Sequence, residues 1–213
     1  MSTTERRRGL FISFEGLDGS GKTTQIGLLA ERLRAQGREV VIAVEPGGTR
    51  VGEQIRAILL DVNNHGLAPE TELLLYFASR AQNVAEVIRP ALERGAIVLA
   101  DRFTDSTIAY QGYGRGLGEA VVRQLHLIAC GDLFPDLTLL LDLEPEVGLA
   151  RARGRGSVNR MDEQARDFYR KVREGYRELA RVEPARFRVI DATASIEEVA
   201  QAVWKAVSQI LSD

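Results

Sequence analysis

The chain has 213 residues, of which 45% are hydrophobic and 27% charged, and its 28 Lys and Arg residues are nearly balanced by 30 Asp and Glu residues. That composition is ordinary for a folded domain, and a formal net charge of −2 argues against a protein that coats nucleic acid. The only cysteine is Cys130 and the only histidines are His65 and His126, which argues against an internal disulfide and against zinc. We therefore expect a domain without zinc, from a reducing compartment.

The N-terminal residues 1–8 are basic, but the apolar run after them ends at Phe14. A secretory signal needs a longer apolar run with a small-residue cleavage site, and a membrane-spanning helix needs about 20 apolar residues. The sequence has neither, so residues 1–8 are expected to form a flexible tail. We expect the protein in the cytoplasm, without a membrane or nucleic acid as partner.

Five short apolar runs separated by longer segments predict an α/β fold with a five-stranded parallel sheet flanked by helices. The strand candidates are residues 10–14, 40–44, 96–100, 137–143 and 187–190. Strands that alternate with helices usually pair in parallel. No Pro-, Gly- or Ser-rich linker and no internal repeat divides the chain, so residues 1–213 are expected to form a single domain.

Two helices and one loop carry clear local signals. Apolar residues at helical spacing predict a helix over residues 22–36, which Gly37 ends. Ser195 stands three residues before Glu198 in the pattern of a capping box, which predicts a last packing helix. Residues 151–160, by contrast, are basic, interrupted by glycines and too polar to pack, so we expect a mobile lid there.

Residues 16–23 read Gly-Leu-Asp-Gly-Ser-Gly-Lys-Thr and fit the pattern G-x-x-x-x-G-K-[ST] between a predicted strand and a predicted helix. Glycines let backbone N–H groups surround a polyphosphate, and the helix N-terminus adds partial positive charge. Lys22 can reach the β and γ phosphates, and Thr23 offers a hydroxyl to Mg²⁺. The pattern therefore predicts a site for nucleotide phosphates.

Phosphate binding by itself suits a switch, a motor or a kinase. The Asn-Lys-x-Asp motif with which guanine-nucleotide switches read their base is absent from the sequence, and a motor would usually bring a larger second domain. The residues therefore favour a small kinase.

Polar residues at the ends of two other predicted strands favour an acceptor site. Asp101 and Arg102 follow the third strand, and ligands of open parallel sheets bind where strands end. Asp101 could orient Mg²⁺ waters, and Arg102 could hold an acceptor phosphate through two hydrogen bonds. The second strand ends in Glu45-Pro-Gly-Gly-Thr49, whose glycines allow a ligand close to the backbone.

Tyr76 and Arg80 lie four residues apart in a helical stretch that begins near Pro69, so they share one face. Together they could stack on a planar base and hydrogen-bond to it. An aromatic residue at this spacing is more often a core residue, and Tyr110 could likewise be buried.

The basic residues of the expected lid allow two interpretations. They are Arg151, Arg153, Arg155 and Arg160. A run of charge is usually a solvated face, but an arginine supplied to a transferring phosphoryl group can raise the rate by about 10³ or more. Because the phosphate loop contains no arginine, the lid is the natural source of one.

Four segments form a specific combination that resembles thymidylate kinases of the bacterial kind. They are residues 14–24, residues 45–49, the pattern Asp101-Arg-Phe-x-x-Ser106 with Ala109-Tyr-Gln111, and the lid followed by Arg160-Met-Asp162. The resemblance runs from about Leu10 to the final helix. It implies the P-loop nucleoside monophosphate kinase fold and transfer of the γ-phosphoryl group of ATP to dTMP, giving dTDP and ADP for dTTP biosynthesis. It also implies Mg²⁺ as cofactor and a homodimer.

Carried over by position, the resemblance implies a role for each matching residue. The residues expected to bind ATP are Gly16, Leu17, Asp18, Gly19, Ser20, Gly21, Lys22, Thr23 and Thr24. Those expected to bind dTMP are Asp18, Glu45, Pro46, Tyr76, Arg80, Arg102, Ser106, Thr107, Tyr110 and Gln111. Thr23 and Asp101 are expected to serve the metal. The expected catalytic residues are Lys22, Arg102, Arg153 and Arg155, the last two because Gly19 stands where some family members have a loop arginine.

The roles implied for single dTMP-binding residues differ. Asp18 is expected at the sugar 3′-hydroxyl and Arg102 at the phosphate. Tyr76 would stack on thymine and Arg80 would read it, while Tyr110 would crowd a ribose 2′-hydroxyl and so favour deoxynucleotides.

Two alternatives stay open. A kinase for another nucleoside monophosphate, or for a deoxynucleoside, would share the phosphate loop, the Asp-Arg pair and the lid. A non-catalytic, ATP-dependent binding module would need only the loop, and the acidic balance and complete acceptor-side set argue against it.

Overall fold

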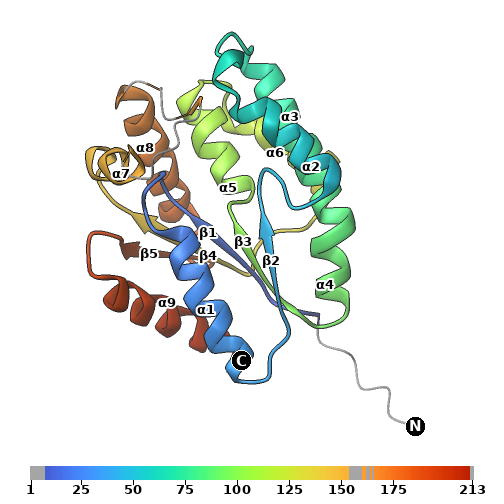
Figure 1. Ribbon diagram of the computed structural model, residues 1–213, viewed down its shortest axis with the longest axis vertical. Coiled ribbons are helices and arrows are strands. Elements are labelled where there is room, and N and C mark those ends of the chain that lie inside the picture. The colour runs from blue at the N-terminus through green and yellow to red at the C-terminus, as the bar shows by residue number, and fades with distance from the viewer. Residues whose placement is uncertain (1–7, 154–159, 162–163, 165, 212–213) are drawn as a thin grey trace.

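The chain folds around a five-stranded sheet in which every pairing is parallel (Figure 1). The computed structural model describes residues 8–153, 160–161, 164 and 166–211. The strands are β1 (Phe11–Glu15), β2 (Val40–Val44), β3 (Ile97–Asp101), β4 (Leu137–Asp142) and β5 (Phe187–Asp191), and their order across the sheet is β2-β3-β1-β4-β5. The predicted parallel sheet is confirmed, with each strand end within one residue of its expected place.

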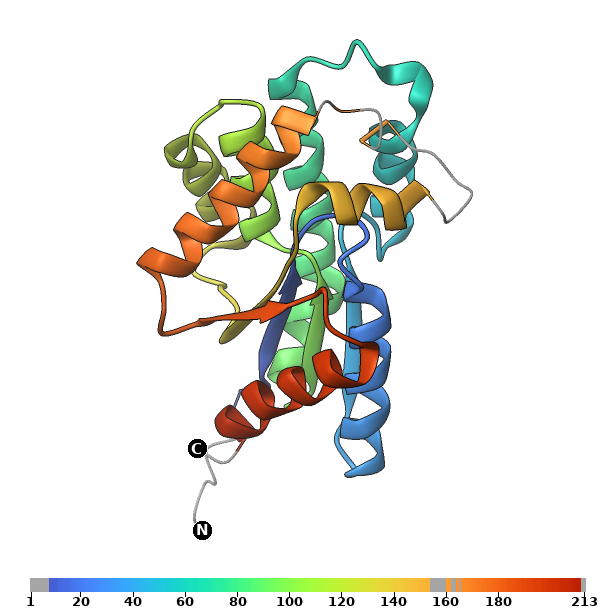
Figure 2. The ribbon, with the colours of Figure 1, turned by 90° about the vertical axis from the view of Figure 1, so that its left-hand side faces the viewer.

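Helices surround this sheet on both faces (Figures 1 and 2). They are α1 (Lys22–Ala35), α2 (Arg50–Leu60), α3 (Pro69–Asn83), α4 (Arg89–Glu93), α5 (Thr104–Thr107), α6 (Glu119–Cys130), α7 (Pro145–Arg153), α8 (Arg166–Val182) and α9 (Ile196–Leu211). A 3₁₀ turn, η1 (Val62–Asn64), follows α2, and two π-helical segments, η2 (Val84–Ile88) and η3 (Ile108–Gly114), extend α3 and α5.

Alternation along the central strand β1 sends successive side chains to opposite faces of the sheet. Ile12 and Phe14 belong to the larger hydrophobic cluster with Leu33 of α1, whereas Phe11 packs in a second cluster with Ala91 of α4. The period of two places Glu15 on the same face as Phe11. The sheet therefore carries an acidic side chain into the protein interior at the carboxyl end of its middle strand.

The end signals of the first and last helices have the expected structure. The helix α1 ends at Ala35, one residue before its expected end, and Gly37 adopts a φ of 77° just beyond it. The amide of Glu198 donates to Ser195 Oγ at 3.2 Å, and the amide of Ser195 donates to Glu198 Oε2 at 2.9 Å. The capping box is confirmed, and α9 packs beside α1 (Figure 2).

The expectation that residues 151–160 are too polar to pack is wrong at both described ends of the segment. Residues 151–153 continue α7, where Ala152 is buried. Arg160 is only 2% exposed. Residues 154–159 of the expected lid and residues 1–7 of the expected tail lie outside the residues that the structure describes. Within the described ranges, no helix has the length and apolar character needed to cross a membrane.

We expect the free energy of unfolding to fall by about 3 kcal/mol in Leu33→Ala, because this substitution opens a cavity under α1. Leu33 is fully buried, whereas Leu28 on the same helix is 39% exposed. Leu28→Ala is therefore the matched control and should cost less than about 1 kcal/mol. Urea unfolding followed by circular dichroism measures both values, and equal losses would contradict this description of the core.

Candidate active site

The loop between β1 and α1 depends on glycine for its path. Gly16 and Gly19 have φ of 133° and 79°, which side-chain-bearing residues rarely adopt. A Cβ atom at Gly16 would lie 2.4 Å from the carbonyl oxygen of Leu141, and one at Gly19 would lie 2.2 Å from that of Gly148. The glycines of the motif therefore let the loop pack directly against β4 and α7.

Lys22, the first residue of α1, reaches back into this loop. Its Nζ donates to the carbonyl oxygen of Gly16 at 3.1 Å and to that of Leu17 at 3.0 Å. Burial, and then repulsion from the guanidinium of Arg102, lowers the pKa of Lys22 to about 8. An anion bound in the loop would favour the charged ammonium group, so the site is electrostatically prepared for phosphate.

Two cavities meet at the carboxyl edge of the sheet. The larger, of about 550 Å³, is lined by the phosphate loop, the end of β3 and α7. The smaller, of about 110 Å³, is lined by Asp18, Glu45, Pro46, Arg56, Leu60, Tyr76, Arg80, Arg102, Ser106, Thr107, Tyr110, Gln111 and Met161. Asp18, Glu45, Arg56 and Arg102 line both cavities. A ligand in one cavity can therefore meet a ligand in the other beside these residues.

Thr23 and Asp101 face each other in the larger cavity. Thr23 Oγ1 donates to Asp101 Oδ2 at 2.9 Å, although the two residues are 78 positions apart in the sequence. A hydroxyl and a carboxylate are oxygen ligands of the kind that Mg²⁺ prefers. In the described part of the chain, no group of three or more His, Cys, Asp and Glu side chains could hold a metal by itself. The pair therefore fits a cation that also takes phosphate oxygens and water as ligands.

Arg102 lies at the junction of the two cavities in a strained backbone conformation. Its φ is 74°, and among the described residues other than glycine it alone has a positive φ. Its amide donates to the carbonyl oxygen of Phe14 at 3.0 Å, which ties the turn after β3 to β1. Strain of this kind persists only where the surrounding structure enforces it, and it is common at functional sites.

The guanidinium of Arg102 is held by side chains from three regions. Its Nη2 donates to Asp18 Oδ1 at 2.8 Å and to the hydroxyl of Tyr110 at 3.2 Å. Its Nη1 donates to Ser106 Oγ at 3.0 Å and to the hydroxyl of Tyr176 at 3.1 Å. The phosphate loop, the α5–η3 segment and α8 therefore place one cation between the two cavities.

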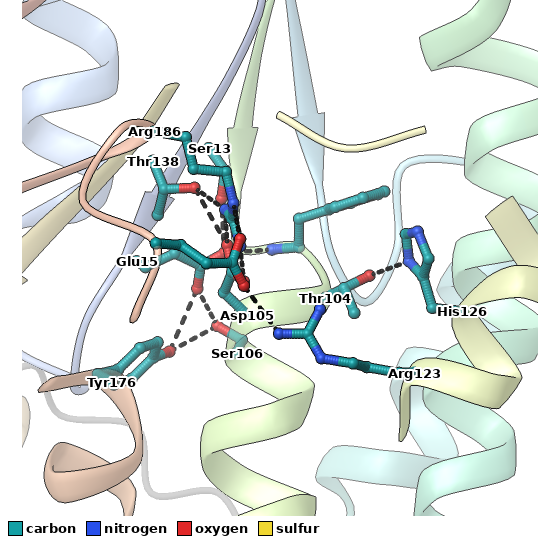
Figure 3. Close-up of polar contacts among 12 residues, drawn as sticks. Ser13, Glu15, Thr104, Asp105, Ser106, Arg123, His126, Thr138, Tyr176 and Arg186 are labelled. Carbon is teal, nitrogen blue, oxygen red and sulfur yellow. Dashed lines mark hydrogen bonds and ion pairs between the residues drawn. The ribbon is translucent and has the colours of Figure 1, made fainter. Parts of the chain in front are cut away.

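Behind Arg102, the fully buried Glu15 organises these hydroxyl groups (Figure 3). Ser106 and Tyr176 donate to its Oε2, the latter at 3.2 Å, while Ser13 and the amide of Phe103 donate to Oε1, the amide at 2.7 Å. A hydroxyl that donates its proton to Glu15 has its lone pairs free to accept from a guanidinium. The carboxylate therefore orients Ser106 and Tyr176 to hold Arg102.

A second group of polar contacts fixes the short helix α5 beneath this network (Figure 3). Arg186 donates to both carboxylate oxygens of Asp105, at 2.6 and 2.7 Å, and to Thr138 Oγ1 at 2.6 Å. Thr104 Oγ1 lies 2.8 Å from His126 Nδ1. Burial lowers the pKa of His126 to about 4, so its ring is neutral near pH 7. These contacts give His126 a structural role.

The smaller cavity has a buried arginine in its wall. Arg80 pairs with Glu45, and its Nη2 donates to the carbonyl oxygen of Phe103 at 3.2 Å. Among the described residues, Nη1 of Arg80 has no hydrogen-bond partner. Tyr76, one turn earlier on α3, is half-buried and lines the same cavity, while Phe77 lies in the core. The expected shared face of Tyr76 and Arg80 is therefore present.

A buried acid also supports this cavity. Glu72 of α3 accepts from Gln111 Nε2 at 2.8 Å and from Arg115 Nη2 at 3.0 Å, and its Oε2 lies 2.6 Å from Arg160 Nη2. Arg160 also donates from Nε to the carbonyl oxygen of Leu59 at 2.9 Å. Arg160 thus anchors the end of the expected lid and is neither a solvated cation nor part of the phosphate cavity.

All ten residues expected to bind dTMP line the smaller cavity. Of those expected to bind ATP, Asp18, Gly19, Gly21, Lys22, Thr23 and Thr24 line the larger one, while Gly16, Leu17 and Ser20 are buried within the loop. The side chain of Arg153 and the whole of Arg155 lie outside the described part of the chain. The sites of the two expected lid arginines are therefore not placed.

Several residues around the cavities were missing from the sequence prediction. Arg56 of α2 lines both cavities and donates from Nη1 to the carbonyl oxygen of Pro46 at 2.6 Å. Arg151 of α7, by contrast, was named among the basic residues of the expected lid, and it lines the larger one. Glu72 and Tyr176 line neither cavity, but they hold residues that do, Glu72 through Gln111 and Tyr176 through Arg102. Only Arg56 had a usable signal, since it lies on the helix that follows the glycine turn after β2.

A parallel sheet of order β2-β3-β1-β4-β5, with a phosphate loop after its central strand and a smaller cavity adjoining the phosphate cavity, defines a P-loop nucleoside monophosphate kinase fold. The comparisons with known proteins narrow this class. Residues 14–203 match the family model for thymidylate kinase. The chain belongs to the thymidylate kinase family, as the sequence resemblance predicted, and is a nucleotide kinase.

Individual relatives agree along nearly the whole chain. The thymidylate kinase of Thermomicrobium roseum is 54% identical over 202 residues, which cover 94% of this chain and 95% of the relative. That of Pelobacter propionicus is 51% identical over 211 residues, covering 96% and 95%. The crystal structure of thymidylate kinase from Ehrlichia chaffeensis superposes with a TM-score of 0.77 at 37% identity, covering 94% of this chain and 99% of that one.

We expect the substitution Glu15→Gln to remove a pH-dependent loss of stability. Burial, and then repulsion from Asp105, raises the pKa of Glu15 from 4.5 to about 7. The folded state therefore keeps a proton that the unfolded chain releases, so ionisation of Glu15 costs stability as the pH rises from about 5 to about 7. Relative to the variant, the wild-type free energy of unfolding should fall by about 2 kcal/mol over this range.

Urea titrations at pH 5, 6, 7 and 8 measure this difference. The absolute offset between the proteins also contains the altered hydrogen bonds of the introduced amide, so only its change with pH is informative. An offset that stays constant from pH 5 to pH 8 would show that Glu15 titrates alike in the folded and unfolded states.

Proposed function

We propose that this chain transfers the γ-phosphoryl group of ATP to dTMP, giving dTDP and ADP. The observation that carries the proposal is the pair of adjoining cavities. The phosphate loop lines the larger cavity, Tyr76 and Arg80 line the smaller one, and Arg102 lines both. Membership of the thymidylate kinase family supplies the identity of the two substrates.

On the donor side, the phosphate loop would hold the ATP phosphates through its backbone N–H groups and Lys22. Thr23 and Asp101 would hold Mg²⁺, directly or through water, and the ion would neutralise charge on the β and γ phosphates. Their hydrogen bond at 2.9 Å supports this assignment, because it places two oxygen ligands side by side at the mouth of the loop.

On the acceptor side, Tyr76 and Arg80 would bind the base, and Asp18 the sugar 3′-hydroxyl. Tyr110, whose hydroxyl lies 3.3 Å from Asp18 Oδ2, would stand against the 2′ position. Arg102 would hold the acceptor phosphate, aided by Arg56, which lines both cavities. Ser106, Thr107 and Gln111 would complete the wall, with Glu45 and Pro46 at the entrance.

In this arrangement an oxygen of the dTMP phosphate attacks the γ-phosphorus directly while the bond to the β-phosphate oxygen breaks and ADP leaves. Lys22 and Arg102 would stabilise the charge that develops on the transferring group. A lid arginine, Arg153 or Arg155, would add to this, since the loop has none. Alanine at each position tests the assignment: the catalytic arginine should lose kcat by about 10² or more.

Assembly and location are further proposals. The family resemblance supports a homodimer, and α3 and the neighbouring α6 expose apolar side chains, of which Ile128 is 82% exposed. Sedimentation equilibrium at micromolar concentration would show a monomer if this proposal is wrong. The cytoplasmic location is proposed from the sequence alone, and fractionation of expressing cells tests it.

The proposed reaction is tested with an ADP-release assay containing ATP and Mg²⁺, in which dTMP is compared with dUMP, dCMP, dGMP, AMP, UMP and thymidine. We expect dTMP to have the highest kcat/KM, with dTDP identified directly as the product. Preference for another monophosphate or for thymidine would support a related kinase instead. Retention of the γ-phosphate without transfer to any acceptor would support an ATP-dependent binding module.

We expect Arg102→Ala to lower kcat/KM for dTMP by about 10³, because it removes the cation that meets the acceptor phosphate. Affinity for an ATP analogue should stay close to that of the wild type, since Lys22 and the loop amides remain. Arg181→Ala is the control, because it removes an exposed arginine of α8 that, among the described residues, bonds only to Glu178. Unchanged turnover in Arg102→Ala would remove this residue from the site.

A further inference from the structure

Glu72 sits in the first turn of α3 and is completely buried, although it lies outside the cavity that its neighbours line. Arg115, just beyond η3, donates to it from Nε at 3.1 Å and from Nη2 at 3.0 Å. Arg160 approaches the other side of the same carboxylate at 2.6 Å. A carboxylate between two guanidinium groups is strongly favoured in its ionised form.

The ionised state of Glu72 decides how Gln111 is oriented. Burial alone would raise the pKa of Glu72, but hydrogen bonds from Arg115 and Gln111 outweigh it and lower the pKa. An ionised carboxylate can only accept hydrogen bonds, so the atom of Gln111 that lies 2.8 Å away must be the amide nitrogen. The orientation of this amide therefore follows from the charge of its neighbour.

With its nitrogen committed to Glu72, Gln111 offers its carbonyl oxygen elsewhere. Gln111 is 2% exposed and lines the smaller cavity, and no described residue donates to its Oε1. The same cavity is lined by Arg80, whose Nη1 is buried without a hydrogen-bond partner among the described residues. The residues that line this cavity thus include one acceptor atom, Gln111 Oε1, and one donor atom, Arg80 Nη1, that have no hydrogen-bond partner among the described residues.

We propose that Glu72 determines the base specificity of the acceptor site by holding Gln111 with its carbonyl oxygen toward the base. Thymine and uracil carry a hydrogen-bond acceptor at O4 beside a donor at N3–H, which matches Arg80 and Gln111. Cytosine carries a donor at N4 and an acceptor at N3, so it mismatches both. Glu72 is thus a positioning residue, and its role rests on the proposed function with a pyrimidine monophosphate as acceptor.

The test compares wild type, Glu72→Gln, Glu72→Asp and Arg123→Met with dTMP, dUMP and dCMP as acceptors. In Glu72→Gln the new neighbour can donate or accept, so the Gln111 amide is free to turn over. Glu72→Asp keeps the charge between the two arginines but withdraws the carboxylate from Gln111 by one methylene. Arg123→Met instead breaks a partly buried ionic cluster with Glu119 and Glu183, whose residues line neither cavity, so it is the matched control.

We expect the ratio of kcat/KM for dTMP over dCMP to fall about tenfold in both Glu72 variants, through a higher KM for dTMP and a lower one for dCMP. Arg123→Met should lose thermal stability but keep the wild-type ratio. Equal losses on dTMP and dCMP in folded Glu72 variants would mean a purely structural role and overturn the proposal. A wild type that rejects both dTMP and dUMP would instead overturn the proposed function, and this inference with it.

Discussion

A carboxylate buried at the end of the central strand is the constraint on which the site depends. Glu15 cannot move, because β3 and β4 flank its strand, and cannot reach water, because α5 and α8 cover it. Its oxygens must be satisfied by donors within the protein. The donors come from β1, the turn after β3, α5 and α8, so satisfying one acid brings four parts of the chain to fixed positions.

Arg102 is the functional outcome of that constraint. Two of the hydroxyl groups that donate to Glu15 accept from its guanidinium, and Asp18 of the phosphate loop accepts from the other side. The strained φ of this residue shows that the surrounding contacts outweigh its local backbone preference. A cation held in this way needs little reorganisation when a phosphate arrives, which is how preorganised sites stabilise charge in a transition state.

The smaller cavity depends on buried ion pairs of a different kind. Arg80 with Glu45, and Glu72 with Arg115 and Arg160, are removed from water at a cost that well-packed apolar residues would avoid. Their benefit is that they fix the orientation of neighbouring polar groups, because an ionised carboxylate can only accept hydrogen bonds. Arg80 thus keeps a defined donor, and Gln111 a defined acceptor, in the wall of the smaller cavity.

The sheet, the phosphate loop and the family could be predicted from the sequence, because they depend on local patterns. The short apolar runs, the spacing of glycines around Lys22 and the Ser195–Glu198 capping box are set by neighbours along the chain, and each has the expected structure. The family resemblance also predicted the residues around the acceptor cavity, because each could be assigned from its position in a matching motif.

The residues that support those motifs depend on contacts that form in the folded chain. Tyr176 reaches Glu15 from 161 positions away, and Arg160 reaches Glu72 from the far end of the expected lid, so no local pattern encodes either contact. Arg160 looked like a surface cation because charge in a sequence predicts exposure, whereas a buried carboxylate reverses that preference. Burial and pairing are properties of the assembled fold, and they determine the state and orientation of each polar group in the site.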